Sequence, residues 1–241
     1  MIYFKQYGEQ RTGTNYLKRL IELNFAGVSI FASILGWKHG MYETGNGYRG
    51  DCNSHEDWVW QKTIDGIVHT VDNYKLRHTP EALLEACPQL NYLISIKNPY
   101  SFVLSFKKFR RPRKTWDVLN VEPWITGYFS RYATWLDLED VTVISFEDLL
   151  TDYTLPLDLL HNKFNLTKKN DTYINEAKVV KASTDHGIMV NNNVDFNSDY
   201  YLKGQYLQEL PDSVIKSITD MISSNSEYMS LMERFNYEII R

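Results

Sequence analysis

The sequence of 241 residues has few cysteines, no long apolar segment and no excess of positive charge. Its two cysteines, Cys52 and Cys87, lack the spacing of a metal site or a disulfide framework, which favours a reducing compartment. No apolar run approaches the roughly 18 residues of a membrane span, and the polar segment 5–11 interrupts the N-terminal apolar run too early for a signal peptide. The net charge of −4 disfavours a general polyanion-binding surface. We therefore expect a cytoplasmic protein that neither spans a membrane nor binds nucleic acid.

The chain does contain an alternation of short β-prone runs with helical patterns. Strands are predicted at 1–7, within 27–37, and at 65–71, 90–97 and 141–146. Helices are predicted at 14–25, 79–87, 98–109 and 122–138, from 147 onward, and at 156–164, 171–180, 211–223 and 226–235. We see no repeat and no linker. This order predicts one α/β domain over residues 1–241, a three-layer sandwich with a mainly parallel central sheet and a helical C-terminal third.

The first predicted strand leads into a glycine loop, Gly8 to Asn15, of pattern G-x-x-x-x-G-T-N. This is the spacing of a phosphate-binding P-loop, but Thr14 stands where a nucleotide triphosphatase carries its lysine. The backbone N–H groups of residues 11–15, the N-terminus of the next helix and the hydroxyls of Thr12 and Thr14 could all bind one phosphate. The simpler interpretation is a tight strand-to-helix turn. Arg11 supplies the strong positive charge of the loop, at its middle and not at its end.

The strand at 90–97 ends in Lys97, where a magnesium-dependent P-loop enzyme would place an aspartate. Without the loop lysine and this carboxylate, ordinary ATP hydrolysis is disfavoured. A cation thus stands where such an enzyme would have its metal-binding carboxylate.

Three segments, in this order, resemble the motifs of the sulfotransferase family. "QRTGTNYL" is similar to the family's 5′-phosphosulfate loop, in which a Lys or Arg precedes Ser/Thr-Gly-Thr. "ISIKNPYSFVLSF" is similar to its second motif, because Lys97, Pro99 and Ser105 keep the spacing of a strand-ending cation, a proline and a serine. "VTVISFEDLL" resembles a later strand followed by "YEDL", with Phe146 in place of the tyrosine.

The resemblance implies transfer of a sulfuryl group from 3′-phosphoadenosine 5′-phosphosulfate to a hydroxyl or amine, without a metal. The residues that it implies at the 5′ side of the donor are Arg11, Thr12, Gly13, Thr14 and Asn15. Those that it implies at the 3′-phosphate are Lys97 and Ser105. Arg11 would also stabilise the charge that grows on the bridging oxygen. The family usually has Arg at the position of Lys97, and a lysine binds phosphate without the bidentate fork. A faint match at 200–210 makes Lys203, with Gly204, a candidate lid over the 3′-phosphate.

A general base must take the proton of the acceptor. His39 in "GWKHG" is the first candidate, with Lys38 beside it to stabilise the transferring sulfonate, since related sulfotransferases often have a His or Glu after this strand. A histidine without any catalytic role is the competing interpretation. His69 is the second candidate, and His55 and His78 rank below it because neither follows a predicted strand.

Several further features of the sequence can be explained either by function or, more simply, by structure. The basic run 107–114 could attract an anionic ligand, although a solvated loop explains it more simply. The aromatic residues at 124, 128, 132 and 135 have the helical spacing that is typical of a core: Trp124, Tyr128, Tyr132 and Trp135. Trp58 and Trp60 could line an acceptor cleft. Glu147 and Asp148 would cap the helix that follows them.

The function classes that stay open are a sulfotransferase, a P-loop kinase that uses ATP, and a non-catalytic nucleotide-binding module of the same fold. The acceptor would be a saccharide or another small molecule. The sequence does not specify it, nor does it specify the oligomeric state.

Overall fold

The computed structural model describes residues 2–31, 38–40, 90–175 and 197–240. Several predictions lie outside the described residues: the strand at 65–71, the helix at 79–87, Cys52, Cys87, His55, His69, His78, Trp58 and Trp60.

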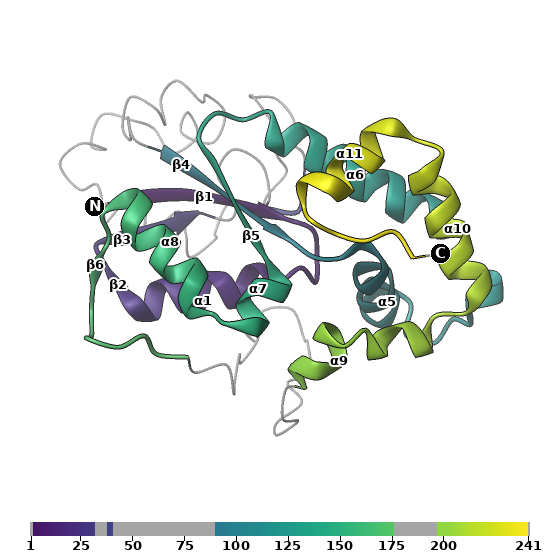
Figure 1. Cartoon of the computed structure of the whole chain (residues 1–241), viewed down its shortest axis with the longest axis horizontal. Helices are drawn as coiled ribbons and strands as arrows, with labels where there is room; N and C mark the ends of the chain where they lie inside the picture. The colour runs from purple at the N-terminus through teal and green to yellow at the C-terminus, as the bar shows by residue number, and fades with distance from the viewer. Residues whose placement is uncertain (1, 32–37, 41–89, 176–196, 241) are drawn as a thin grey trace.

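The described part of the chain contains a four-stranded parallel sheet (Figure 1). Its strands are β3 (Val28–Phe31), β1 (Ile2–Gly8), β4 (Leu90–Ile96) and β5 (Val141–Ser145), in that spatial order. Gly8 lies opposite Ser95, and Ile96 lies opposite Ser145, so these strands end at the same edge of the sheet. A separate antiparallel pair joins β2 (Phe25–Ala26) to β6 (Thr167–Lys168). The predicted mainly parallel sheet is confirmed.

Helices cover both faces of the sheet (Figure 1). One face packs against α1 (Thr14–Asn24), α7 (Phe146–Thr151) and α8 (Thr154–Phe164). The other packs against α5 (Pro99–Arg110), α6 (Glu122–Leu136), α10 (Asp212–Ser223) and α11 (Ser226–Arg234). The shorter elements are the helix α9 (Ser198–Leu202) and the 3₁₀ turns η2 (Trp116–Val118) and η4 (Gln205–Glu209). The three-layer α/β architecture with a helical C-terminal third is confirmed.

Aromatic side chains fill the layer between the sheet and α6. Tyr128, Tyr132 and Trp135 are fully buried, and the Trp135 ring stacks on Tyr7 of β1 at 5.5 Å between centroids. Trp124 is partly buried and contacts Phe106 edge-to-face at 5.2 Å. The helical spacing of these residues therefore places them in the core and not in a stacking site.

Three local predictions are wrong, each for a tertiary reason. Phe25 does not end the first helix but begins β2, where it pairs with Lys168. Residues 171–175 are not helical: the side chain of Asn24 bonds both the N–H (2.6 Å) and the carbonyl (2.8 Å) of Ile174, and these bonds replace helical ones. The cap of α7 is Ser145, whose hydroxyl accepts from Asp148 N at 2.9 Å, and not the acidic pair that follows.

Candidate functional site

The candidate site lies where β1, β4 and β5 end. Parallel sheets bind ligands at this edge because the loops that follow the strands converge there. The chain at 38–40 also reaches this edge, since Gly8 N donates to the Lys38 carbonyl at 2.9 Å. Residues that are far apart in the sequence therefore surround one loop.

The glycine loop between β1 and α1 has an unusual backbone. Arg11 has φ of 73° and Gly13 has φ of 82°, so both lie in the left-handed region. A Cβ on Gly13 would come within 2.6 Å of the Phe146 ring, so only glycine fits there. The Thr12 hydroxyl and N–H both donate to the Glu9 carbonyl, at 2.7 and 3.2 Å, and this turn fixes the shape of the loop. A strained arginine in such a loop is typical of functional sites.

The N-terminus of α1 carries no side-chain cap and no acidic residue in its first turn. By contrast, Asn98 caps α5 and Ser145 caps α7. The first amides of α1, including those of Thr14 and Asn15, have no intrahelical acceptor, and the helix dipole makes this end positive. The arrangement can bind an anion through the backbone.

Lys97 follows β4 and is only 2% exposed. Its ammonium donates to the Ser105 hydroxyl at 2.9 Å and lies over the rings of Tyr201 (4.2 Å) and Phe146 (4.6 Å). Burial lowers the pKa of Lys97 to about 7; the nearby Glu147 opposes this shift, and Arg11 and Lys108 add to it. The two residues that the resemblance assigns to the 3′-phosphate, Lys97 and Ser105, are thus in contact with each other beside two aromatic rings.

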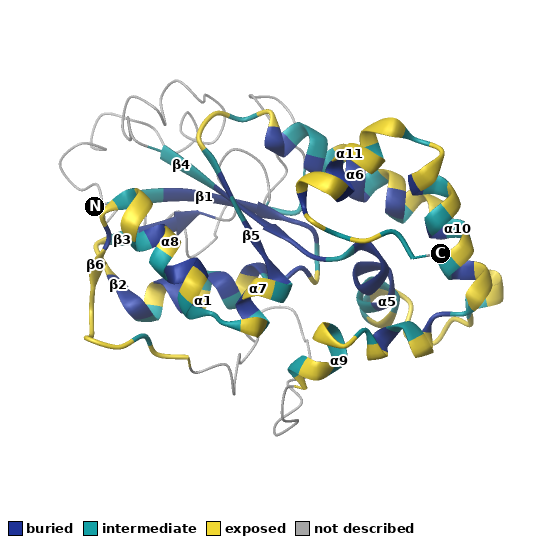
Figure 2. Cartoon of the chain, in the orientation of Figure 1, coloured by how far each residue is buried: buried dark blue, intermediate teal, exposed yellow. Residues whose placement is uncertain are grey.

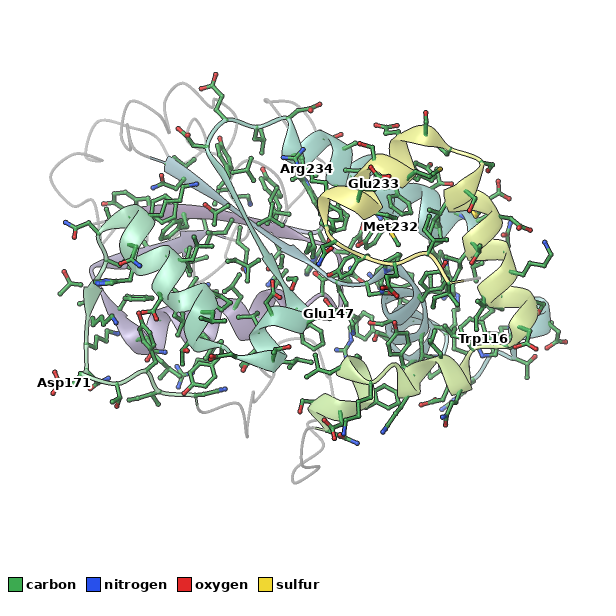
Figure 3. All side chains as sticks on the ribbon, in the orientation of Figure 1. Trp116, Glu147, Asp171, Met232, Glu233 and Arg234 are labelled. Atoms are coloured by element: carbon green, nitrogen blue, oxygen red, sulfur yellow. The ribbon has the colours of Figure 1, made fainter. Side chains whose placement is uncertain are left out.

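Glu147, labelled in Figure 3, is the acidic group whose charge acts on Lys97. One carboxylate oxygen accepts from Asn98 N at 3.1 Å, and the other accepts from the Tyr237 hydroxyl at 2.7 Å. Burial raises the pKa of Glu147, and these hydrogen bonds and the charge of Lys97 counteract the rise. Glu147 thus ties the ends of β4 and β5 to the C-terminal segment.

His39 lies against the start of the glycine loop. Its Nδ1 is 2.5 Å from the Gly8 carbonyl, which can only accept, so Nδ1 carries the proton and the lone pair lies on Nε2. Lys38 donates to Asn15 Oδ1 at 2.5 Å and so lies beside the first turn of α1. Burial, and then the charges of Lys38, Lys5 and Arg131, lower the pKa of His39 to about 3, against the opposing hydrogen bond to Gly8. The imidazole is therefore neutral at physiological pH.

We predict that His39 does not titrate between pH 5 and pH 8. Its lowered pKa of about 3 means that a proton adds only in strong acid, because burial and neighbouring cations oppose a charged ring. The measurement is a ¹H–¹³C NMR titration of the histidine ring signals, with His39→Gln to assign the resonance. A titration midpoint near 6.5 would contradict the buried geometry.

Glu9 forms a buried ion pair with Arg131 of α6 at the base of the loop. The Glu9 side chain is 3% exposed, and burial raises its pKa although Arg131 opposes the rise. Gly127, one turn before Arg131, leaves room for the guanidinium, since a Cβ there would lie 2.8 Å from it. The pair holds the glycine loop against α6.

The predicted site residues form two groups. Arg11 is exposed, lies 5.4 Å over the Phe109 ring of α5 and acts electrostatically on Lys97. The charges that act on His39 are instead those of Lys38, Lys5 and Arg131. Arg11 thus belongs with Lys97 and Ser105, whereas Lys38, His39 and Asn15 gather at the other side of the loop.

The late basic segment is placed differently from the other candidates. Lys203 ends α9, and its ammonium bonds Asp199 at 2.7 Å in the solvent. It is Tyr201 of α9 that covers Lys97. Of the basic run 107–114, Lys107, Lys108 and Arg110 belong to the last turn of α5, and residues 111–114 are exposed.

Sequence reasoning missed Tyr201, Glu9 and Arg131. Tyr201 stands two residues before the Lys203-Gly204 pair, and this closeness was its only sequence signal. Glu9 lies inside the recognised loop, but its partner Arg131 is 122 residues away, and nothing in the pattern connects them.

Among the described residues, no group of three or more His, Cys, Asp or Glu side chains is arranged to hold a metal ion. None of the helices in this part of the chain combines the length and apolarity needed to cross a membrane.

Comparisons with known proteins give a likeness to solved structures. No family model and no curated protein sequence matches the chain. Among solved structures, the chain is similar to a sulfotransferase from Alicyclobacillus acidocaldarius, with 15% identity over 99% of this chain and 97% of that one and a TM-score of 0.48.

Proposed function

We propose that the protein is a sulfotransferase that uses 3′-phosphoadenosine 5′-phosphosulfate and transfers its sulfuryl group to a hydroxyl or amine of a saccharide or other small molecule. The proposal rests on the ends of β1 and β4, where the chain offers two anion-binding features side by side.

The first feature suits the 5′-phosphate. The loop from Arg11 to Asn15 has an uncapped helix N-terminus, and Gly13 keeps the backbone open where a side chain would collide with Phe146. Backbone amides can hold an anion there without a metal. Thr12 supports the loop through its bonds to Glu9, so its role is to shape the cradle.

The observation that carries the proposal is the buried Lys97–Ser105 pair. The ammonium donates to a hydroxyl and is only partly compensated by the charge of Glu147, and a buried cation in such a position is costly unless function requires it. Register places it near the loop, because Gly8 and Ser95 are opposite each other on β1 and β4. A nucleotide with phosphates at both its 5′ and 3′ positions would use both features, whereas ATP would leave the second unused.

Different residues of the site would act on different parts of the transfer reaction. When bound, the donor supplies a sulfuryl group, and the bond from sulfur to the bridging phosphate oxygen breaks with its electron pair on that oxygen. Arg11 and the α1 amides would stabilise the negative charge there. His39 Nε2 would take the proton of the acceptor as its oxygen or nitrogen bonds to sulfur. Lys38, held beside α1 by Asn15, would stabilise the transferring group.

The neutral state of His39 suits this role. A general base must be unprotonated before it acts, and the lowered pKa of about 3 ensures this at neutral pH. The negative charge of a bound donor would raise the proton affinity of the ring toward the range where a base is effective.

The test is calorimetric titration with 3′-phosphoadenosine 5′-phosphate, the product that the donor would leave, and separately with ATP and magnesium. We expect the bisphosphate to bind regardless of magnesium, and Lys97→Ala to weaken it about 10- to 100-fold, the effect of losing a hydrogen bond to a charged group. Lys114→Ala, which removes an exposed charge of the basic run, is the matched control and should change affinity less than threefold.

Other outcomes separate the alternatives. Binding of ATP with magnesium alone would reject the sulfotransferase and favour a kinase. Binding of the bisphosphate, together with unchanged donor consumption in His39→Gln across a panel of saccharide and phenol acceptors, would reject the histidine as base. If neither nucleotide binds, the proposed function is wrong.

A further inference from the structure

Lys97, which the proposed function assigns to the 3′-phosphate, is closed off from solvent in this structure. Its exposure is 2%, and the ammonium packs against two aromatic rings that also contact each other. One ring belongs to Phe146, at the rigid junction of β5 and α7. The other belongs to Tyr201 of α9, a five-residue helix. A phosphate can contact the ammonium only if one of these covers moves.

Phe146 is the fixed cover. It is 8% exposed, begins α7 directly after a core strand and packs against the left-handed Gly13 of the loop. A displacement of Phe146 would therefore disturb the sheet edge and the glycine loop together.

Tyr201 is the movable cover. None of the residues of α9 is buried, and Figure 2 shows the helix in the colours of exposed and intermediate residues. The Tyr201 ring contacts Phe146 and Tyr200 edge-to-face, at 5.2 and 5.0 Å. Tyr200 and Tyr201 pack against the core but stay only partly buried, so this five-residue helix is held more weakly than the core helices.

An exposed cluster of hydrogen-bonded side chains, Tyr200, Lys108 and Glu209, links α9 to α5 and η4 and is called the polar clamp below. The Tyr200 hydroxyl lies 2.5 Å from Glu209 Oε1 and 3.2 Å from Lys108 Nζ, and Lys108 forms an ion pair with Glu209 at 2.7 Å. Lys108 and Glu209 are 51% and 45% exposed, so solvent screens the pair and it stabilises the closed position only slightly. The clamp can therefore open at little cost.

We propose that Tyr201 is a displaceable cover of the 3′-phosphate subsite, so that only a ligand with a 3′-phosphate removes its ring from Lys97. The ring and the phosphate compete for the same ammonium, the ring through a cation–π contact and the phosphate through a charge-assisted hydrogen bond. A nucleotide without the 3′-phosphate offers no replacement for the ring and leaves it in place. Tyr201 thereby becomes a specificity-determining residue. The inference rests on the proposed function for the identity of the ligand, but the cover itself can be tested without any nucleotide.

The first experiment measures access to Lys97. The protein is treated briefly with acetic anhydride at pH 8, and acetylation of Lys97 is quantified by mass spectrometry. We expect Tyr201→Leu to react at least fivefold faster than wild type, and the matched control Tyr201→Phe, which keeps the ring, to react at the wild-type rate. Tyr200→Phe, which breaks the clamp without a change of charge, should give an intermediate rate. Equal rates in all four proteins would overturn the proposal.

The second experiment measures the competition. Calorimetry compares 3′-phosphoadenosine 5′-phosphate with adenosine 5′-monophosphate on the same proteins, after circular dichroism has verified that each is folded. We expect Tyr201→Leu to bind the bisphosphate several-fold more tightly and the monophosphate unchanged. Weaker bisphosphate binding in Tyr201→Leu would mean that the ring holds the ligand and does not cover the site, which would overturn the proposal. Failure of wild type to bind the bisphosphate would reject the proposed function, while the acetylation result would still decide whether Tyr201 covers Lys97.

Discussion

The affinity for 3′-phosphoadenosine 5′-phosphate is expected to fall about tenfold with each pH unit above 7. The lowered pKa of Lys97, about 7, is the cause: burial is the largest contribution, and Arg11 and Lys108 add to it. Below pH 7 the ammonium is charged and binds phosphate. As the pH rises above 7, Lys97 of the unliganded protein loses this proton. Lys97 must then take up a proton again when the ligand binds, and the affinity falls for that reason. The ligand contributes little to the slope, since the second pKa of a phosphate monoester is about 6.

Calorimetry at constant ionic strength between pH 6 and pH 9 measures this dependence. Titration in buffers of different ionisation enthalpy at pH 8 should also show uptake of close to one proton for each ligand bound. Lys97→Arg is the matched control, because a guanidinium keeps its charge throughout this range and should make the profile nearly flat. A steep profile that persists in Lys97→Arg would assign the proton to another group and contradict the prediction.

Replacement of Arg131 by methionine is expected to destabilise the protein by about 3–5 kcal/mol at pH 8, the cost of leaving one partner of a buried ion pair without the other. Glu9 is the residue left behind, and its side chain is only 3% exposed. Burial already raises the pKa of Glu9 in the presence of Arg131, and without that cation the pKa rises further. The folded variant then binds more protons than the unfolded chain. Its stability is therefore present at acidic pH, where Glu9 is protonated, and is lost as the pH rises above the unfolded value of about 4.5.

Urea denaturation at pH 5 and at pH 8 measures the two free energies of unfolding. The double variant Glu9→Gln/Arg131→Met carries no unpaired carboxylate and should recover more than half of the loss at pH 8. Arg113→Met, at an exposed position of the basic run, should change stability by less than about 0.5 kcal/mol. If Arg131→Met costs the same at both pH values, the damage comes from lost packing and not from the charge of Glu9.

The candidate site is predictable from sequence where its residues are close along the chain. Lys97 and Ser105 are eight residues apart across a strand end and the following helix, and the structure finds their side chains in contact at 2.9 Å. The glycine loop is predictable for the same reason, since its spacing between a strand and a helix is a local property. His39 is a candidate because it follows a predicted strand, and its contact with the Gly8 carbonyl places it at the loop.

Local patterns fail where a distant partner decides. The predicted helix at 171–180 is replaced over residues 171–175 because Asn24 bonds Ile174 from 150 residues away. Lys203, a candidate lid from its sequence motif, bonds Asp199 in the structure, and its role toward a donor stays a prediction. Tyr201, which has no motif of its own, occupies the position over Lys97.

The sequence by itself determined the alternation of strands and helices, the glycine loop between β1 and α1 and the cations near the strand ends. All of these depend on neighbouring residues: side-chain periodicity, glycine at a left-handed position and the residue that ends each strand. Only the tertiary structure decided how far these cations are buried, and with that the pKa of Lys97. Whether Lys97 is charged and how it is covered depend on Phe146, Glu147 and Tyr201, which come from α7 and α9 and meet it only when the chain folds. Burial and Coulomb interactions act through space, and the sequence does not record those distances.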